Sequence, residues 1–191
     1  MLLLPKLKRG DKIAVVSPSF GAAGKWPHMY SLGLSRLRDV FGFEPVELPA
    51  TKKIGASNQE RASDLIAAFE DRSVKAVIAS LGGGDQITYI KNLPPDPFVQ
   101  NPRPFFGFSD NTHFANFLWL NGIPSFYGGS LLPQFAMQKR MDPYTATPTV
   151  DQPTEQPKGR SVRSRASCAR QWGEGELRVV RWWPVFSRRA C

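Results

Sequence analysis

Apolar residues alternate along the chain between short continuous runs and helical spacings. Residues 12–17 (KIAVVS) form a β-branched run that predicts a buried strand, which ends at the turn Ser17-Pro18-Ser19. Apolar side chains then recur at i, i+4, i+7 and i+11, and predict one face of a helix that ends at Gly42: Tyr30, Leu34, Leu37 and Phe41.

The next two elements repeat this order. Residues 43–48 (FEPVEL) predict a second strand, and Pro45 places it at a sheet edge because proline cannot donate a ladder hydrogen bond. Ser57 and Glu60 are spaced as a capping box, in which each side chain bonds a backbone N–H at the start of a helix. The buried face of this helix follows at i, i+3, i+4 and i+7: Ala62, Leu65, Ile66 and Phe69.

Three more apolar runs complete the pattern. The predicted strands cover residues 74–81, 105–109 and 123–129, and the predicted helical segments cover residues 87–93 and 110–120. Strands that alternate with helices imply a parallel sheet, because each crossover returns the chain to the same end. We therefore expect an α/β fold with a doubly wound, mostly parallel sheet of the flavodoxin- or Rossmann-like type.

Ligands of such sheets bind outside the carboxyl ends of the strands. Three turns of this chain belong there: Ser17-Pro18-Ser19, the glycine run Gly82-Gly83-Gly84, and Ser109-Asp110. We expect them to meet at one edge of the sheet, which makes Ser17, Ser19 and Gly82 candidate substrate contacts.

Ser109 stands where a strand passes directly into a helix. A serine at such a sharp turn is lifted above the sheet, and this resembles a nucleophile elbow, in which the next N–H helps to hold an oxyanion. Asp110 would supply that N–H, and the glycine run could supply a second one, each worth about 3 kcal/mol in the transition state. The pattern is G-x-S-D-N rather than G-x-S-x-G, so a second interpretation stays open: Ser109 or Asp110 caps the helix.

The composition and the cysteine spacing argue against a membrane protein, a secreted protein and a metal-binding protein. The 191 residues contain no apolar run near the roughly 18 residues of a membrane span, and the three leucines at the start are too short for a secretory signal. We therefore expect a cytoplasmic protein. Cys168 and Cys191 are not spaced as metal ligands, and no metal site is predicted.

The glycine run has other interpretations. It lacks the lysine and the spacing of a phosphate loop, and no G-x-G-x-x-G follows the first strand, which leaves nucleotide binding a minor alternative. A tight turn without a binding role also fits the glycines. A non-catalytic α/β domain that binds a small ligand is a further alternative.

Four segments carry a resemblance to a known family: SPSF, SLGGGDQ, NPRPFFGFSDNT and PSFYGG. In this order and at these separations, they resemble the N-terminal domain of the LD-carboxypeptidase serine peptidases, over about residues 5–144. That family includes muramoyltetrapeptide carboxypeptidases and microcin C self-immunity peptidases, and the LGGGD form is closer to the microcin type. The resemblance implies hydrolysis of an amide bond near the C-terminus of a small peptide, either a muropeptide or a peptidyl-nucleotide, without a cofactor.

The resemblance also implies roles for individual residues. Ser109 would be the nucleophile and form an acyl-enzyme, and the N–H groups of Asp110 and of Gly83 or Gly84 would form the oxyanion hole. In the family, a Glu and a His from a second, C-terminal domain complete the triad. This chain has only His28 and His113, both within the first domain, so we expect weak activity or none from this chain as it stands.

Residues 145–191 differ abruptly from residues 1–144. They contain one Leu, no Ile and eight Arg, they sustain no helical or alternating period, and they contribute five of the nine net positive charges. We expect a basic tail of low order in place of the family's second domain, as a frameshift would produce. A native basic tail that binds nucleic acid is the alternative, and a homodimer is left open.

Overall fold

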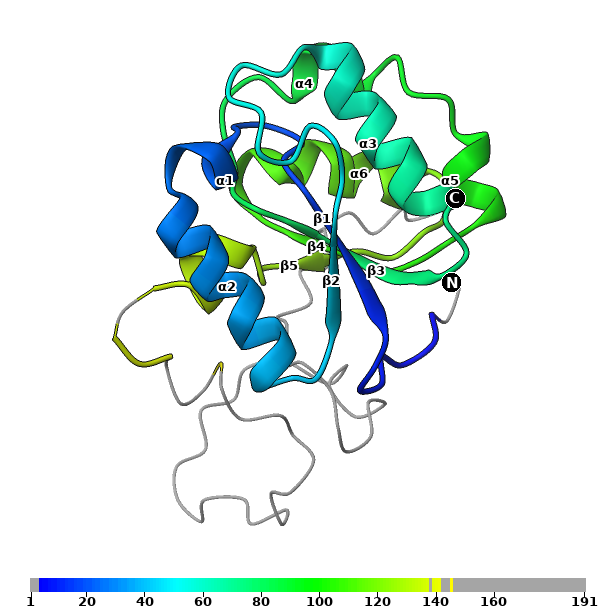
Figure 1. Ribbon diagram of the computed structural model, residues 1–191. Coiled ribbons are helices and arrows are strands. Elements are labelled where there is room, and N and C mark those ends of the chain that lie inside the picture. Colours follow the sequence, from blue (N-terminus) through cyan, green and yellow to red (C-terminus); the bar gives the residue numbers. More distant parts are fainter. Residues whose placement is uncertain (1–3, 138, 142–144, 146–191) are drawn as a thin grey trace, which may run out of the picture.

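Five parallel strands form the centre of the molecule (Figure 1). The computed structural model describes residues 4–137, 139–141 and 145. In this part of the chain the sheet order is β2-β1-β3-β4-β5, and every neighbouring pair is parallel. The strands are β1 (Lys12–Val16), β2 (Glu44–Glu47), β3 (Val74–Ala79), β4 (Phe105–Gly107) and β5 (Phe126–Tyr127). The predicted α/β fold with a parallel sheet is confirmed, and β2 lies at an edge, as Pro45 predicts.

Helices connect successive strands. They are α1 (Ala22–Lys25), α2 (Pro27–Asp39), α3 (Asn58–Glu70), α4 (Ile87–Ile90), α5 (Asp96–Gln100) and α6 (Thr112–Leu120). A 3-10 turn, η1 (Ser109–Asn111), precedes α6, and a π-helical turn, η2 (Leu131–Phe135), follows β5. The predicted basic tail lies outside the described residues, apart from Thr145.

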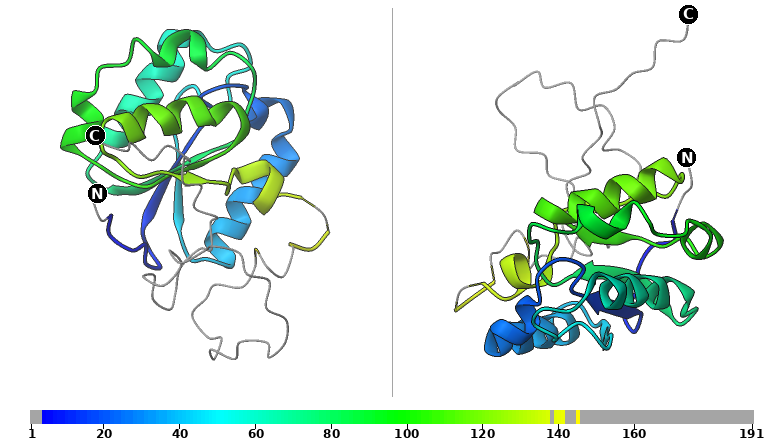
Figure 2. Two further views of the ribbon diagram at one scale, coloured as in Figure 1. Left: turned by 180° about the vertical axis from the view of Figure 1, so that it is seen from behind. Right: turned by 90° about the horizontal axis from the view of Figure 1, so that it is seen from above.

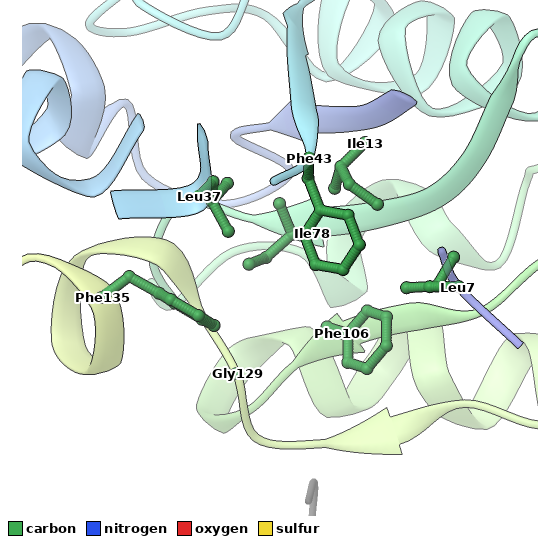
Figure 3. A pocket seen from close by; sticks show the side chains of 8 residues that line it. All are labelled: Leu7, Ile13, Leu37, Phe43, Ile78, Phe106, Gly129 and Phe135. Carbon is green, nitrogen blue, oxygen red and sulfur yellow. The ribbon is translucent and has the colours of Figure 1, made fainter. Parts of the chain in front are cut away.

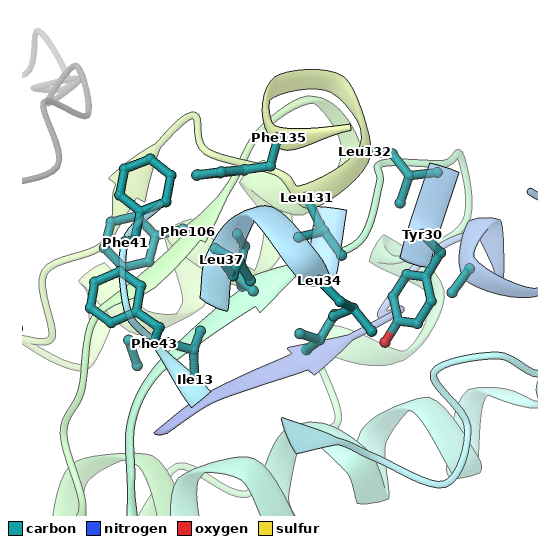
Figure 4. Close-up of a cluster of buried hydrophobic side chains, with 14 of the residues drawn as sticks. Ile13, Tyr30, Leu34, Leu37, Phe41, Phe43, Phe106, Leu131, Leu132 and Phe135 are labelled. Carbon is teal, nitrogen blue, oxygen red and sulfur yellow. The ribbon is translucent and has the colours of Figure 1, made fainter. Parts of the chain in front are cut away.

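One face of the sheet packs against α2 and η2 (Figure 4). Tyr30, Leu34 and Leu37 of α2 lie in one buried cluster with residues of β1, β3 and β4. η2 closes this cluster with Leu131, Leu132 and Phe135. Alternate residues of β1, Ile13 and Val15, point to this face, as the period of two of a strand requires.

The opposite face packs against α3, α5 and α6, and α6 lies across the sheet from α2 (Figure 2). Phe69, Phe98 and Phe114, one from each of these helices, meet edge to face with centroid separations of 4.9–5.9 Å. Ala14 and Val16 of β1 belong to this second cluster, so β1 is buried on both faces. A strand that is buried on both faces has a continuous run of apolar residues instead of an alternating pattern, and this explains the sequence KIAVV of β1.

A small apolar hollow remains on the α2 face (Figure 3). Its lining comes from the N-terminal segment, three strands, α2, the connection from α2 to β2, and the segment after β5: Leu7, Ile13, Leu37, Phe43, Ile78, Phe106, Gly129 and Phe135. The lining, as the structure describes it, includes none of the residues predicted for the site.

Several boundaries differ from the sequence-based predictions. Three strands are shorter than predicted: β3 ends at Ala79, β4 ends at Gly107, and β5 covers only Phe126–Tyr127. α2 ends at Asp39, and Gly42 follows with a φ of +71°, a backbone conformation that glycine adopts without strain. α4 ends at Ile90 instead of residue 93, and the predicted helix 110–120 begins as the turn η1. None of the described helices is both long enough and apolar enough to span a membrane.

Candidate active site

Ser109 has a strained backbone at the carboxyl edge of the sheet. β4 ends at Gly107, and Ser109 then takes a φ of +61° as η1 begins. Of the residues that the structure describes, Ser109 is the single non-glycine residue with a positive φ. This conformation costs a non-glycine residue about 1–2 kcal/mol, and it leaves the serine exposed above the strand.

The glycine run reaches Ser109 through its first residue. A Cβ built on Gly82 would lie 3.0 Å from Ser109 Cβ, 3.1 Å from Ser109 Oγ and 3.4 Å from the Asp110 nitrogen. A Cβ on Gly83 would lie 2.7 Å from Ser19 Cβ, whereas one on Gly84 would meet nothing within 4 Å. The absence of side chains therefore lets the run approach the Ser109 turn at Gly82 and the β1 turn at Gly83.

The Asp110 carboxylate joins the three turns. Its Oδ2 accepts a hydrogen bond from Ser19 Oγ at 2.6 Å and another from the Gln86 N–H at 3.1 Å. Its Oδ1 lies 3.5 Å from His113 Nε2, and the side chain is only 6% exposed. Neither η1 nor α6 has a side-chain cap at its N-cap residue, so Asp110 bonds other turns instead of capping its own helix.

Two buried amides strengthen this junction. Asn111 Nδ2 donates to the carbonyls of Leu81 and Phe108, and Gln86 Nε2 donates to Asn111 Oδ1 at 3.2 Å. Gln86 Oε1 accepts the Phe114 N–H at 3.0 Å, and this bond satisfies an N–H of the first turn of α6. Both amide side chains are fully buried. Both residues stand within segments that carry the family resemblance, SLGGGDQ and NPRPFFGFSDNT, but their spacing predicts no role for them. Uncharged polar residues beside helix starts are the signal that could have found them.

The β1 turn is anchored through its own buried groups. Ser17 Oγ donates to the Thr51 carbonyl at 2.6 Å and lies 2.7 Å from Ser80 Oγ. The Tyr89 hydroxyl donates to the Pro18 carbonyl at 2.6 Å, and burial raises the pKa of this phenol, which keeps it protonated. The predicted substrate contacts at Ser17 and Ser19 thus lie in one turn, with both hydroxyls bonded within the protein; their contact with a substrate stays a prediction.

The histidines lie apart in the fold. His113 is on α6 near Asp110, with its side chain 39% exposed, and His28 is exposed on α2. Within the described residues, no hydrogen bond joins Ser109 Oγ to a side chain that could act as a base. The same residues contain no group of three His, Cys, Asp or Glu side chains placed to hold a metal ion. The site therefore presents a hydroxyl, nearby backbone amides and a positioned carboxylate.

Known proteins are similar to this chain in sequence and in fold. YocD of Bacillus subtilis, whose name describes a carboxypeptidase, is 29% identical over 140 residues, which cover 72% of this chain and 43% of YocD. A crystal structure of an MccF-like protein from Streptococcus pneumoniae in complex with AMP is 33% identical, with a TM-score of 0.64 over 71% of this chain and 42% of that chain. The microcin C7 self-immunity protein MccF, in complex with aspartyl sulfamoyl adenosine, is 26% identical with a TM-score of 0.69 over 73% of this chain and 43% of its own.

These relatives are longer proteins, and this chain spans less than half the length of each. The family model for the LD-carboxypeptidase N-terminal domain matches residues 13–128, which contain the three turns of the site and, except for Lys12 at the start of β1, all five strands. The chain belongs to the LD-carboxypeptidase family.

Proposed function

We propose that this chain is the nucleophile-bearing domain of a serine peptidase that cleaves an amide bond near the C-terminus of a small peptide. The observation that carries the proposal is the conformation of Ser109, exposed at a left-handed turn beside Gly82. Strained backbone of this kind concentrates at functional sites. The exposed hydroxyl and the neighbouring amides are the groups that acyl transfer requires.

In the proposed reaction, Ser109 Oγ attacks the carbonyl carbon of the substrate while a base takes the hydroxyl proton. The Asp110 N–H and an N–H of the glycine run, from Gly83 or Gly84, stabilise the negative charge that develops on the carbonyl oxygen. The C–N bond then breaks, the amine leaves with the proton, and water hydrolyses the acyl-serine. This sequence needs neither a metal nor another cofactor.

The base is the part of this reaction that residues 13–128 do not supply. We assign it to a Glu and a His outside the matched domain, because His113 faces the Asp110 carboxylate and His28 lies on α2. The chain by itself should consequently react slowly, since a serine hydroxyl is a weak nucleophile without a base.

The ligands of two relatives support a candidate substrate class. MccF was solved with aspartyl sulfamoyl adenosine, and the Streptococcus pneumoniae protein with AMP. A small peptide joined to a nucleotide is therefore our first candidate, and a muropeptide is the second.

A fluorophosphonate probe tests the nucleophile directly, because it forms a covalent bond with activated serines. We expect slow labelling of one residue, Ser109, located by peptide mass spectrometry. Ser109→Ala should abolish the labelling, while Ser63→Ala, at an exposed serine of α3, should leave it unchanged. Labelling that persists in the Ser109→Ala variant would exclude Ser109 as the nucleophile.

A further inference from the structure

The Asp110 carboxylate has contacts that a solvated surface aspartate lacks. One oxygen, Oδ2, receives two donors from two different turns: the Ser19 hydroxyl after β1 and the Gln86 N–H after the glycine run. Charge-assisted bonds of this kind are stronger than those between neutral groups. With both donors bonded and only 6% of the side chain exposed, this carboxylate is placed to hold the turns together instead of accepting a substrate proton.

The residues on either side of Asp110 show what its contacts hold. Ser109, directly before it, has the strained φ of +61°, and its carbonyl accepts a 2.6 Å hydrogen bond from Thr112 Oγ1. Asn111, directly after it, is fully buried and tied to Leu81 and Gln86. A strained residue keeps its conformation only when its surroundings over-determine it, and the Asp110 and Asn111 side chains supply that constraint.

We propose that Asp110 is a positioning residue for the proposed hydrolysis: its carboxylate binds Ser19 and Gln86, and thereby fixes its own N–H and the Ser109 hydroxyl beside the glycine run. This inference rests on the proposed function, and it adds a role for the side chain to the role of the backbone N–H. Ser19 belongs to the same hydrogen-bond network, because its hydroxyl is linked to the Ser109 turn through the Asp110 carboxylate.

The geometry also predicts which substitutions of Asp110 preserve the hydrogen bonds from Ser19 and Gln86. Both donors converge on a single oxygen, so the side-chain oxygen of an asparagine can accept both bonds while its NH2 group faces His113. Asp110→Asn should therefore retain the turn, whereas Asp110→Ala leaves two donors unpaired. Displacement of reacting groups by about 1 Å can cost about 100-fold in rate.

The experiment measures the kinetics of Ser109 labelling by the fluorophosphonate probe, together with the melting temperature, on the full chain. We expect Asp110→Ala to lower kinact about 30-fold and Ser19→Ala about 10-fold at unchanged KI, and Asp110→Asn to stay within about 3-fold of the unsubstituted chain. Arg103→Lys is the control for a loss of stability alone, since Arg103 is a buried side chain whose hydrogen bonds to the carbonyls of Phe69, Asp71 and Val74 lie away from the carboxyl edge of the sheet. It should lower the melting temperature and leave kinact unchanged.

Amide hydrogen exchange at Gln86 gives a readout that does not depend on catalysis. Its N–H should exchange faster in Asp110→Ala and retain its protection in Asp110→Asn and Arg103→Lys. Equal kinact values in Asp110→Ala and the unsubstituted chain would overturn the inference, as would losses that only follow the melting temperature across all variants. If the unsubstituted chain is not labelled, the proposed function fails, and unchanged Gln86 protection in Asp110→Ala would then separately overturn the positioning role. If Asp110→Ala does not fold, the kinact values of Ser19→Ala and Asp110→Asn still test the positioning role.

Discussion

At the scale of single residues, Ser109 combines a chemical group with an unfavourable backbone. Replacing a residue that has a φ of +61° with glycine stabilises the folded protein, because glycine adopts this conformation without steric cost. We expect Ser109→Gly to raise the free energy of unfolding by about 1 kcal/mol while it removes the labelled hydroxyl. Urea denaturation followed by circular dichroism measures the change.

The same substitution in a helix provides the control for Ser109→Gly. Ser63 is exposed in α3, where glycine is less favourable than serine, so Ser63→Gly should destabilise the protein by about 0.5 kcal/mol. Changes of opposite sign in the free energy of unfolding for Ser109→Gly and Ser63→Gly would support strain at Ser109. A loss of stability at both would show that the Ser109 turn is not strained.

Asp64 gives the stability a pH dependence. It is buried, with Oδ2 accepting the Ala50 N–H at 2.9 Å, and burial is the main cause that raises its pKa from 3.8 to about 6, with a smaller contribution from Glu60. Between pH 4 and 6 the folded chain thus binds more protons than the unfolded chain, and its stability falls as the pH rises. Asp64→Asn should remove a penalty of about 3 kcal/mol at pH 7 and have little effect below pH 4.

Melting temperatures from pH 4 to pH 8 test this prediction. The Asp64→Asn variant should melt higher than the unsubstituted chain at pH 7, and the two curves should converge toward pH 4. Asp39→Asn, at an exposed position of α2, should not produce this convergence. A constant difference between the Asp64→Asn and unsubstituted chains at all pH values would contradict the raised pKa.

At the scale of elements, Arg103 joins the end of α3 to the start of β3. Its guanidinium donates to the carbonyls of Phe69, Asp71 and Val74, and burial lowers its pKa from the ordinary value. These acceptors include carbonyls at the carboxyl end of a helix, where positive charge is stabilising. The arginine of the NPRPFF segment therefore has a structural role, away from the carboxyl edge.

Arg103→Lys should destabilise the protein by about 3 kcal/mol. A single ammonium group cannot reproduce the planar set of donors, and the buried carbonyls left without partners carry a desolvation cost. Urea midpoints measure the effect, with Arg72→Lys at an exposed position as the control. If both substitutions cost less than about 0.5 kcal/mol, the carbonyl contacts do not contribute to stability.

Elements whose signals are local could be predicted from the sequence, and contacts between distant elements could not. The capping box is present, since Ser57 Oγ accepts the Glu60 N–H and the Glu60 side chain accepts the Ser57 N–H. The glycine run and the Ser109 turn were placed at one edge by topology alone. The Gln86–Asn111 contact needed the tertiary structure, because residues 25 positions apart meet only after the strands have paired.

At the scale of the whole molecule, the site is built from a compact part of the sequence. The hydrogen bonds that position the Ser109 turn join residues between Ser19 and Phe114, all within the matched family domain. The α2 face needs a longer segment, because Leu131, Phe135 and Met141 belong to its buried cluster. The boundary of the folded unit should accordingly lie after residue 141.

Truncation tests this boundary and the role of the basic segment together. A chain that ends at residue 144 keeps every contact named above, so we expect a melting temperature within about 2 °C of the full chain and unchanged labelling of Ser109. Its net charge falls from +9 to +4, because residues 145–191 hold nine Lys and Arg against four Asp and Glu, and salt-sensitive retention on DNA should weaken accordingly. A chain that ends at residue 129 loses the buried side chains of Leu131, Leu132, Phe135 and Met141 from the α2 face, and we expect it to be destabilised by several kcal/mol. Equal loss of stability in both truncated chains would place residues 145–191 within the folded unit and contradict the division at residue 144.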